Sequence, residues 1–103
     1  NDNSYENLFF QKFWAHIYSD HKWFYDFDDL VLPSDNLFYK KYKEQFLKGS
    51  YSARNPDEDF AESFTAFVLW EKPIKSTVID QKILFFYDFP KLVEMRDFIR
   101  SNL

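Results

Sequence analysis

Aromatic side chains dominate this chain, while glycine is nearly absent. The sequence contains 14 Phe, 7 Tyr and 3 Trp but only one Gly and four Pro. Close-set β-hairpins usually need glycine in their turns, so the composition argues against a turn-rich β-sandwich. With 46% hydrophobic residues, the 103-residue chain can bury the core of one small domain. We therefore expect a single helical domain over residues 1–103, with an all-α fold that forms an irregular bundle of about five helices.

The charge and the lack of cysteine exclude several classes of function. Seventeen acidic residues against thirteen Lys and Arg give a net charge of -4, so the chain has no field that would attract nucleic-acid phosphates. Without cysteine it can form neither a disulfide nor a thiolate metal site. No apolar run approaches the roughly 18 residues that a membrane crossing needs. We therefore expect no nucleic-acid partner and no membrane span.

Two helices are predicted in the N-terminal half. Apolar residues that share one face of a 3.6-residue repeat predict a helix over residues 4–20, namely Phe10, Phe13, Trp14 and Ile17. A second helix is expected to begin with Ser34 or Asp35 as its N-cap. It should end near Gly49, which suits the left-handed residue after a helix.

The chain has two histidines, His16 and His21, which are five residues apart. On a helix this spacing separates the two side chains by about 140°. Two metal ligands on one helix need a four-residue step to share a face. The histidines therefore do not form a zinc-binding helix, and we expect helix-end polar contacts or solvent exposure for both.

Two more helices are predicted in the C-terminal third. Pro73 should stop the helix before it. Residues 77–89 keep helical spacing with Thr77 or Asp80 as a cap, although their composition would also suit a strand. Pro90 suits the first turn of a last helix. The apolar residues of this last helix are expected to point inward or to lie beside the core, namely Leu92, Met95, Phe98 and Ile99.

The most informative stretch is 51–67, a short polar loop followed by a helix. Asn55 is a suitable N-cap, and Pro56 suits the first helical position. A helical wheel places five apolar residues on one face, namely Phe60, Ala61, Phe64, Phe67 and Val68. The opposite face carries Glu58, Glu62, Thr65 and Leu69. The two glutamates therefore project together, away from the aromatic stripe.

The glutamate pair has two interpretations on pattern alone. A glutamate in the first turn of a helix, followed by a solvated polar face, is common and implies no function. A first-turn carboxylate can also bind a metal, while the carboxylate one turn later orients another ligand. Leu69 on the same face favours contact with another helix over contact with water. The spacing leaves both interpretations open.

The stretch Tyr51-Ser-Ala-Arg-Asn-Pro-Asp-Glu58-Asp-Phe-Ala-Glu62-Ser-Phe64 resembles one half of the zinc site of the gluzincin metallopeptidases. The resemblance is to the group that includes the catalytic domain of anthrax lethal factor and a set of bacterial zinc-binding metallopeptidases. Its pattern is a Tyr, a short polar link with Asn, and then Glu-x-Phe-Ala-Glu-x-Phe. The flanking residues 10–14 and 85–93 also resemble the bacterial group. The resemblance implies that the chain is the C-terminal portion of a zincin-like peptidase domain.

Carried over to this chain, the resemblance implies a separate role for each of three residues. Glu58 would be the third protein ligand of a zinc ion. Glu62 would hydrogen-bond a zinc-binding histidine and fix its tautomer. Tyr51 would be catalytic and would donate its hydroxyl to the tetrahedral intermediate or to the leaving group. Because zinc in such a site activates water for attack on a peptide carbonyl, the substrate would be a peptide or protein.

The zinc helix of that family, His-Glu-x-x-His, occurs nowhere in the 103 residues. One carboxylate cannot hold catalytic zinc in water, so we expect the chain alone to bind no zinc and to be inactive. Its first residue is Asn1 rather than Met, which predicts a processed or truncated piece of a longer protein. The resemblance implies that the missing N-terminal segment supplies the zinc helix. The resemblance implies a secreted or cell-envelope location. The alternative, from a different class, is a non-catalytic helical module that binds another protein.

Overall fold

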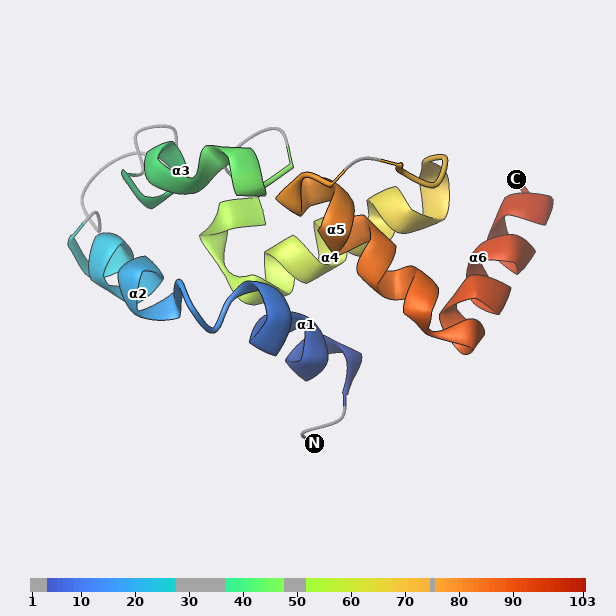
Figure 1. Ribbon diagram of the computed structural model, residues 1–103, viewed down its shortest axis with the longest axis horizontal. Helices are drawn as coiled ribbons and strands as arrows, with labels where there is room; N and C mark the ends of the chain where they lie inside the picture. Colours follow the sequence, from blue (N-terminus) through green and yellow to red (C-terminus); the bar gives the residue numbers. More distant parts are fainter. Residues whose placement is uncertain (1–3, 28–36, 48–51, 75) are drawn as a thin grey trace.

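The computed structural model describes residues 4–27, 37–47, 52–74 and 76–103. Six α-helices lie in these ranges: α1 (Tyr5–Phe13), α2 (Tyr18–Phe27), α3 (Leu37–Tyr42), α4 (Pro56–Leu69), α5 (Val78–Phe85) and α6 (Pro90–Ser101). Three short 3-10 helices accompany them: η2 (Lys43–Gln45), η3 (Ser52–Arg54) and η4 (Phe86–Asp88). All regular structure in the described residues is helical, which confirms the predicted all-α fold (Figure 1).

Helix α4 lies at the centre of the molecule. Helices α1 and α5 pack against it and against each other, while α6 packs against its C-terminal end. Helices α2 and α3 pack together at the opposite end of the molecule from α6 (Figure 1). The molecule is elongated, with Cα extents of 44 × 29 × 23 Å. Because α1, α5, α6 and η3 all pack against α4, its orientation depends on several distant segments of the chain.

The single helix predicted over residues 4–20 is two helices in the structure, so six α-helices are described rather than about five. In the turn between α1 and α2, the Ala15 N–H donates to the Phe10 carbonyl, five residues earlier instead of four. Trp14 and Ile17 are buried at this turn. The break lets α2 leave the direction of α1 and pack on α3.

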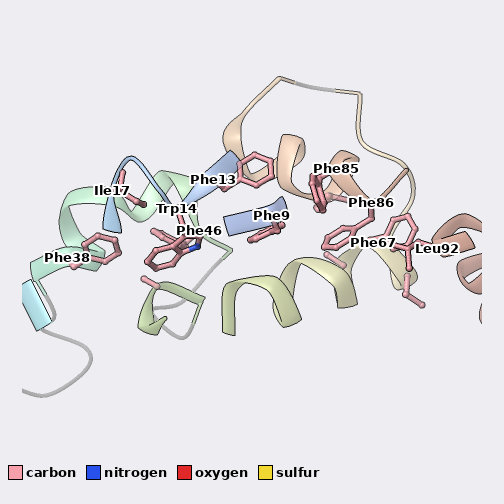
Figure 2. Packing of buried hydrophobic residues seen from close by; sticks show 14 residues of the cluster. Phe9, Phe13, Trp14, Ile17, Phe38, Phe46, Phe67, Phe85, Phe86 and Leu92 are labelled. Carbon is pink, nitrogen blue, oxygen red and sulfur yellow. The ribbon is translucent and has the colours of Figure 1, made fainter. Parts of the chain in front are cut away.

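The core is built mainly from aromatic rings. Fourteen buried apolar side chains of the described residues form one cluster, which runs from the α2–α3 end to α6 (Figure 2). Phe86 is fully buried within it. Its ring centroid lies 5.2–5.9 Å from five other rings, those of Phe9, Phe60, Phe64, Phe67 and Phe85. Such pairs contribute about 0.5–1.5 kcal/mol each beyond the burial of their area. The high aromatic content therefore serves the core.

The last two helices, α5 and α6, begin where the sequence predicted. The Thr77 hydroxyl caps α5 by accepting a hydrogen bond from the Asp80 N–H at 3.1 Å, and Pro90 is the first residue of α6. Leu92 is buried as predicted. Met95 and Phe98 are 46% and 70% exposed, so the prediction that they lie in or beside the core is wrong. The reason is that α6 lies at one end of the molecule, where other elements cover only one of its faces (Figure 1).

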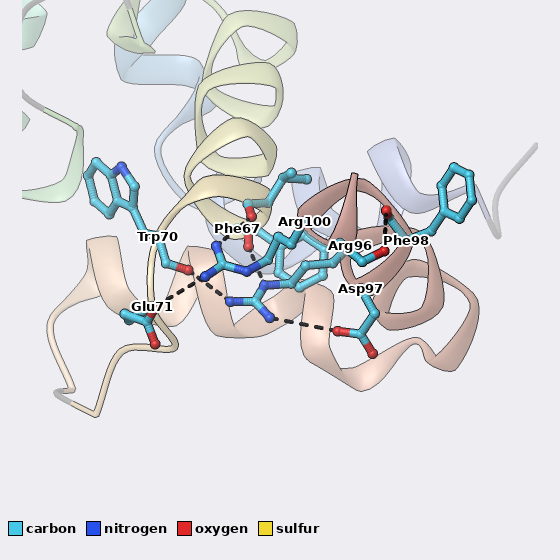
Figure 3. A network of polar contacts seen from close by, with 9 residues as sticks. Phe67, Trp70, Glu71, Arg96, Asp97, Phe98 and Arg100 are labelled. Atoms are coloured by element: carbon cyan, nitrogen blue, oxygen red, sulfur yellow. Dashed lines mark hydrogen bonds and ion pairs between the residues drawn. The ribbon is translucent and has the colours of Figure 1, made fainter. Parts of the chain in front are cut away.

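Helix α4 ends against two arginines of α6. Arg96 donates to the carbonyl oxygens of Phe67 at 2.7 Å and Trp70 at 2.9 Å. Arg100 donates to the carbonyl oxygen of Val68 at 3.0 Å. These carbonyls lie at or just after the last helical turn, where C=O groups lack partners within the helix. The two guanidinium groups lie side by side at this helix end (Figure 3). Side chains distant in the sequence therefore cap α4, which was not predicted.

Candidate functional site

Both glutamates of the predicted half-site lie on α4. Glu58 is half-buried, and Glu62, one turn later, is exposed. Asn55 is the N-cap, as predicted, because its Oδ1 accepts a hydrogen bond from the Glu58 N–H at 2.9 Å. Within the described part of the chain, neither carboxylate forms an ion pair. Both carboxylates are therefore available to a further ligand or segment.

Tyr51 lies outside the described residues, so its catalytic role stays a prediction. The chain is described again from Ser52, in the turn η3. Ser52 and Ala53 are buried there, and η3 packs against α4. The segment that leads into the N-cap of α4 is thus fixed against the helix that carries Glu58.

The outer face of α4 carries Glu62, Thr65 and Leu69, all exposed as the helical wheel predicted. A groove of about 190 Å³ lies on this face. Its lining combines one carboxylate with mostly apolar side chains, namely Leu47, Glu62, Thr65, Ala66 and Trp70. Leu69 and Trp70 are each 51% exposed. Glu62 therefore borders a groove that is lined mostly by apolar side chains.

The inner face of α4 differs from the predicted stripe. Ala61 is exposed, and Phe60 and Phe64 are only half-buried, although the wheel placed all three on the core face. Asp59 and Ser63 are instead almost completely buried. The prediction is therefore wrong for Ala61, because the helix is turned so that a charged residue lies inside.

The buried charge of Asp59 is fully partnered. Its carboxylate accepts a hydrogen bond from Trp14 Nε1 at 2.9 Å and lies 2.7 Å from Lys82 Nζ. The Lys82 ammonium also donates to the Gln45 carbonyl at 2.6 Å and lies 4.0 Å from the centroid of the Phe46 ring. The two charged side chains are 0% and 2% exposed. Four segments of the chain thus meet at one buried ion pair.

Burial has the largest effect on the ionisation of this pair. It raises the pKa of the Asp59 carboxyl and lowers the pKa of the Lys82 ammonium, while the charge of each partner opposes both shifts. Loss of hydration thus offsets much of the attraction between the two charges. Sequence reasoning missed the pair. The available signal was Lys82 within the mostly apolar segment 78–87, because a buried lysine needs a partner.

His21 is buried and holds the turn before α4. Its Nε2 donates to the Arg54 carbonyl at 2.8 Å, and its ring packs edge-to-face on Trp14 with centroids 5.0 Å apart. Of the two alternatives predicted for the histidines, exposure is wrong for His21, whose polar contact lies at the end of η3, whereas His16 is exposed. The bond to Arg54 ties α2 to η3, although the two are far apart in sequence.

We expect His21 to make stability depend on pH. Burial lowers its pKa below the ordinary value, and the carbonyls of Arg54 and Ala53 oppose the shift. A depressed pKa in the folded state gives stability that is present above about pH 6.5 and is lost as the pH falls through the folded pKa. In a His16→Gln variant, His21 is the only histidine. Its ring-proton NMR signal should titrate below about pH 6.5 in the folded protein and at about 6.5 in urea. Equal midpoints would contradict the burial of His21.

Within the ranges that the structure describes, no group of three or more His, Asp or Glu side chains is arranged to hold a metal ion. None of the helices in those ranges combines the length and apolar character needed to cross a membrane. Comparison with known proteins found no matching protein-family model, no matching curated protein and no matching solved structure.

Proposed function

We propose that the chain is the C-terminal portion of a zinc-dependent metallopeptidase, in which Glu58 is the third protein ligand of the zinc ion. The observation that most supports this proposal is the state of the glutamate pair. Glu58 and Glu62 lie one turn apart on the outer face of α4, and neither pairs with a cation among the described residues. Their chemistry fits one of the three ligand positions of a catalytic zinc site.

Three residues of the chain would have separate roles in that site. Glu58 would supply a carboxylate oxygen to the metal, and Glu62 would accept the ring N–H of a histidine ligand and so fix its orientation. When bound, zinc supplies an activated water for attack on a peptide carbonyl. Tyr51 would donate a hydrogen bond to the oxyanion that forms. The two histidine ligands and the general base would come from a His-Glu-x-x-His segment outside these 103 residues.

The groove beside Glu62 supports the idea of an additional segment. Trp70, which is 51% exposed, and Leu47 both line this groove, and Leu69 is 51% exposed on the same face of α4. Apolar side chains that gather on one face usually indicate a surface that another segment covers. A helix with an apolar face and a histidine near Glu62 would bury these side chains and give the carboxylate a hydrogen-bond donor.

Glu58→Gln should weaken zinc binding by the full-length protein by at least about 10–100-fold, the effect seen for residues that only orient metal ligands. The amide keeps the shape of the side chain but removes the anionic ligand. Zinc content per chain and competition with a chelator measure the effect. Asp57→Asn is the matched control, because Asp57 lies exposed in the same helical turn and the charge change is identical. Equal zinc affinity in the two variants would exclude Glu58 as a ligand.

Reading the gene upstream of Asn1 gives an independent check. The proposal requires a His-Glu-x-x-His segment within roughly a hundred residues, about the length of one domain. Its absence there would end the peptidase proposal without any measurement on the protein.

A non-catalytic module that binds another protein is the second candidate function. The exposed apolar side chains favour it, since Leu69 and Trp70 are 51% exposed and Phe98 is 70% exposed. In such a module Glu58 and Glu62 would tolerate replacement by Ala without loss of partner binding. Sedimentation of the isolated chain as a strict monomer, with no apolar dye binding, would count against this candidate.

A further inference from the structure

The rotation of α4 about its own axis does not follow from its hydrophobic pattern. The pattern would bury Phe60, Ala61 and Phe64 together, since these lie on one side of the helical wheel. In the structure Ala61 is exposed, and the two phenylalanines are only half-buried. The helix is therefore turned from the orientation that the pattern predicts, although Phe67 and Val68 of the same stripe are buried. Some other interaction must hold it there.

The interaction that holds α4 in this orientation is made by Asp59. Its carboxylate is completely buried and is bound by Trp14, at the end of α1, and by Lys82 of α5. Lys82 in turn donates to the carbonyl of Gln45 in η2. To turn α4 toward its apolar stripe, the protein would have to separate a buried ion pair, which is strongly unfavourable. Asp59 is thus the charged residue of α4 whose contacts oppose the hydrophobic pattern, and the hydroxyl of the buried Ser63 lies 3.5 Å from its carboxylate.

The contacts at the two ends of α4 fix its position but not its rotation about its own axis. At the N-terminal end, His21 holds the turn that precedes the Asn55 cap through the Arg54 carbonyl. At the C-terminal end, Arg96 binds the Phe67 carbonyl. Bonds to backbone atoms near the axis fix where a helix begins and ends. A side chain bound on one side of the axis fixes how far the helix is turned.

The rotation matters for the glutamates because metal sites tolerate little displacement. Functional groups must be held within about 0.5 Å of the productive geometry. Glu58 and Glu62 extend from the helix, so a turn toward the apolar stripe would move both carboxylates by far more than this tolerance. Precise placement of Glu58 therefore requires a fixed rotation of α4.

We propose that Asp59 is a positioning residue, which Trp14 and Lys82 bind and which sets the rotation of α4 and therefore the positions of the Glu58 and Glu62 carboxylates. The role of the glutamates in this statement rests on the proposed zinc function. The rotation itself can be measured without zinc, so the two proposals fail separately.

Thiol reactivity can measure the rotation, because the chain has no cysteine of its own. Ala61→Cys places a thiol at an exposed position that would turn inward if α4 followed its apolar pattern. Glu62→Cys, on the adjacent outer face, gives a matched control thiol that stays exposed in both orientations. The reaction rate with a water-soluble aromatic disulfide reports the exposure of each thiol.

Each thiol is then combined with Asp59→Ala/Lys82→Met, which removes both buried charges together. We expect the ratio of the Ala61→Cys thiol rate to the Glu62→Cys thiol rate to fall by about tenfold, since thiol reactivity follows exposure. An unchanged ratio in the folded double variant overturns the proposal. If circular dichroism shows that the double variant is unfolded, the same ratio of thiol rates is measured with Trp14→Phe in its place. It keeps an aromatic ring but removes the Nε1 donor, and the ratio should fall by about threefold in the same direction.

Zinc affinity of the full-length protein separates this inference from the proposed function. The double variant should bind zinc about 10–100-fold more weakly than the wild type. If Glu58→Gln loses zinc but the thiol ratio does not move, the positioning role is wrong and the zinc role of Glu58 stands. If the thiol ratio moves but Glu58→Gln keeps its zinc, Asp59 sets the rotation of a helix that is not a zinc site.

Discussion

Replacing Lys82 by Met should lower the free energy of unfolding by about 3–5 kcal/mol, the cost of removing one partner of a buried ion pair. The ammonium lies 2.7 Å from the Asp59 carboxylate, and both side chains are buried. Without it, the carboxylate would keep only neutral hydrogen-bond donors, and the Gln45 carbonyl would lose its donor. Met has a similar length and no charge, so the loss reports the missing charge rather than a large cavity.

Urea denaturation followed by circular dichroism measures this effect, with Lys41→Met as the matched control. Lys41 pairs with Asp20 at 2.8 Å, but the two side chains are 53% and 39% exposed. An exposed pair contributes little, so this control should unfold near the wild-type midpoint. Adding Asp59→Ala to Lys82→Met should restore part of the loss, because no unpaired charge then remains. If Lys82→Met and Lys41→Met had the same urea midpoint, the buried ion pair would not contribute to stability.

The local features of the fold could be predicted from the sequence. Asn55 and Thr77 cap their helices through hydrogen bonds to an N–H three residues later, and Pro90 begins α6. Such signals depend only on neighbouring residues, so they can be found without knowledge of the rest of the fold. The all-α class followed from the same kind of reasoning applied to composition.

The long-range polar contacts could not be predicted in the same way. Asp59 pairs with Lys82, and Arg96 caps a helix that ends well before it in the sequence. A helical wheel assumes that apolar residues choose the buried face. It therefore placed Ala61 inside and said nothing of Asp59. Burial of a charged residue such as Asp59 can be predicted only if its partner is known. That partner, Lys82, lies on another helix.

For the candidate site, the sequence predicted that the two glutamates share a helix face, but not which side chains surround them. The four-residue step between Glu58 and Glu62 placed both on one face of a helix, as the structure shows. The groove beside Glu62 depends on Leu47, which comes from a different segment. Tyr51 lies outside the described residues. The roles of all three residues stay proposals, because a zinc site also needs ligands that these 103 residues do not contain.

Replacing Phe86 by Ala should cost about 3–5 kcal/mol, the usual effect of truncating a buried aromatic side chain. Phe86 is fully buried at the junction of α5 and η4. Its ring meets those of Phe9 from α1 and Phe67 from α4, among others (Figure 2). Truncation would therefore remove aromatic contacts to several helices at once. The cavity would lie where α1, α4 and α5 converge, so none of these helices could close it without losing its other contacts.

Phe98→Ala is the matched control for this prediction, since the same atoms are removed from a ring that is 70% exposed on α6. A surface substitution of this kind should change stability by no more than about 0.5 kcal/mol. Thermal and urea unfolding of the two variants measure the difference. Phe86→Leu should lie between them, because it refills much of the volume but restores no ring contacts. If Phe86→Ala were no more destabilising than Phe98→Ala, the aromatic cluster around Phe86 would not be what holds the three helices together.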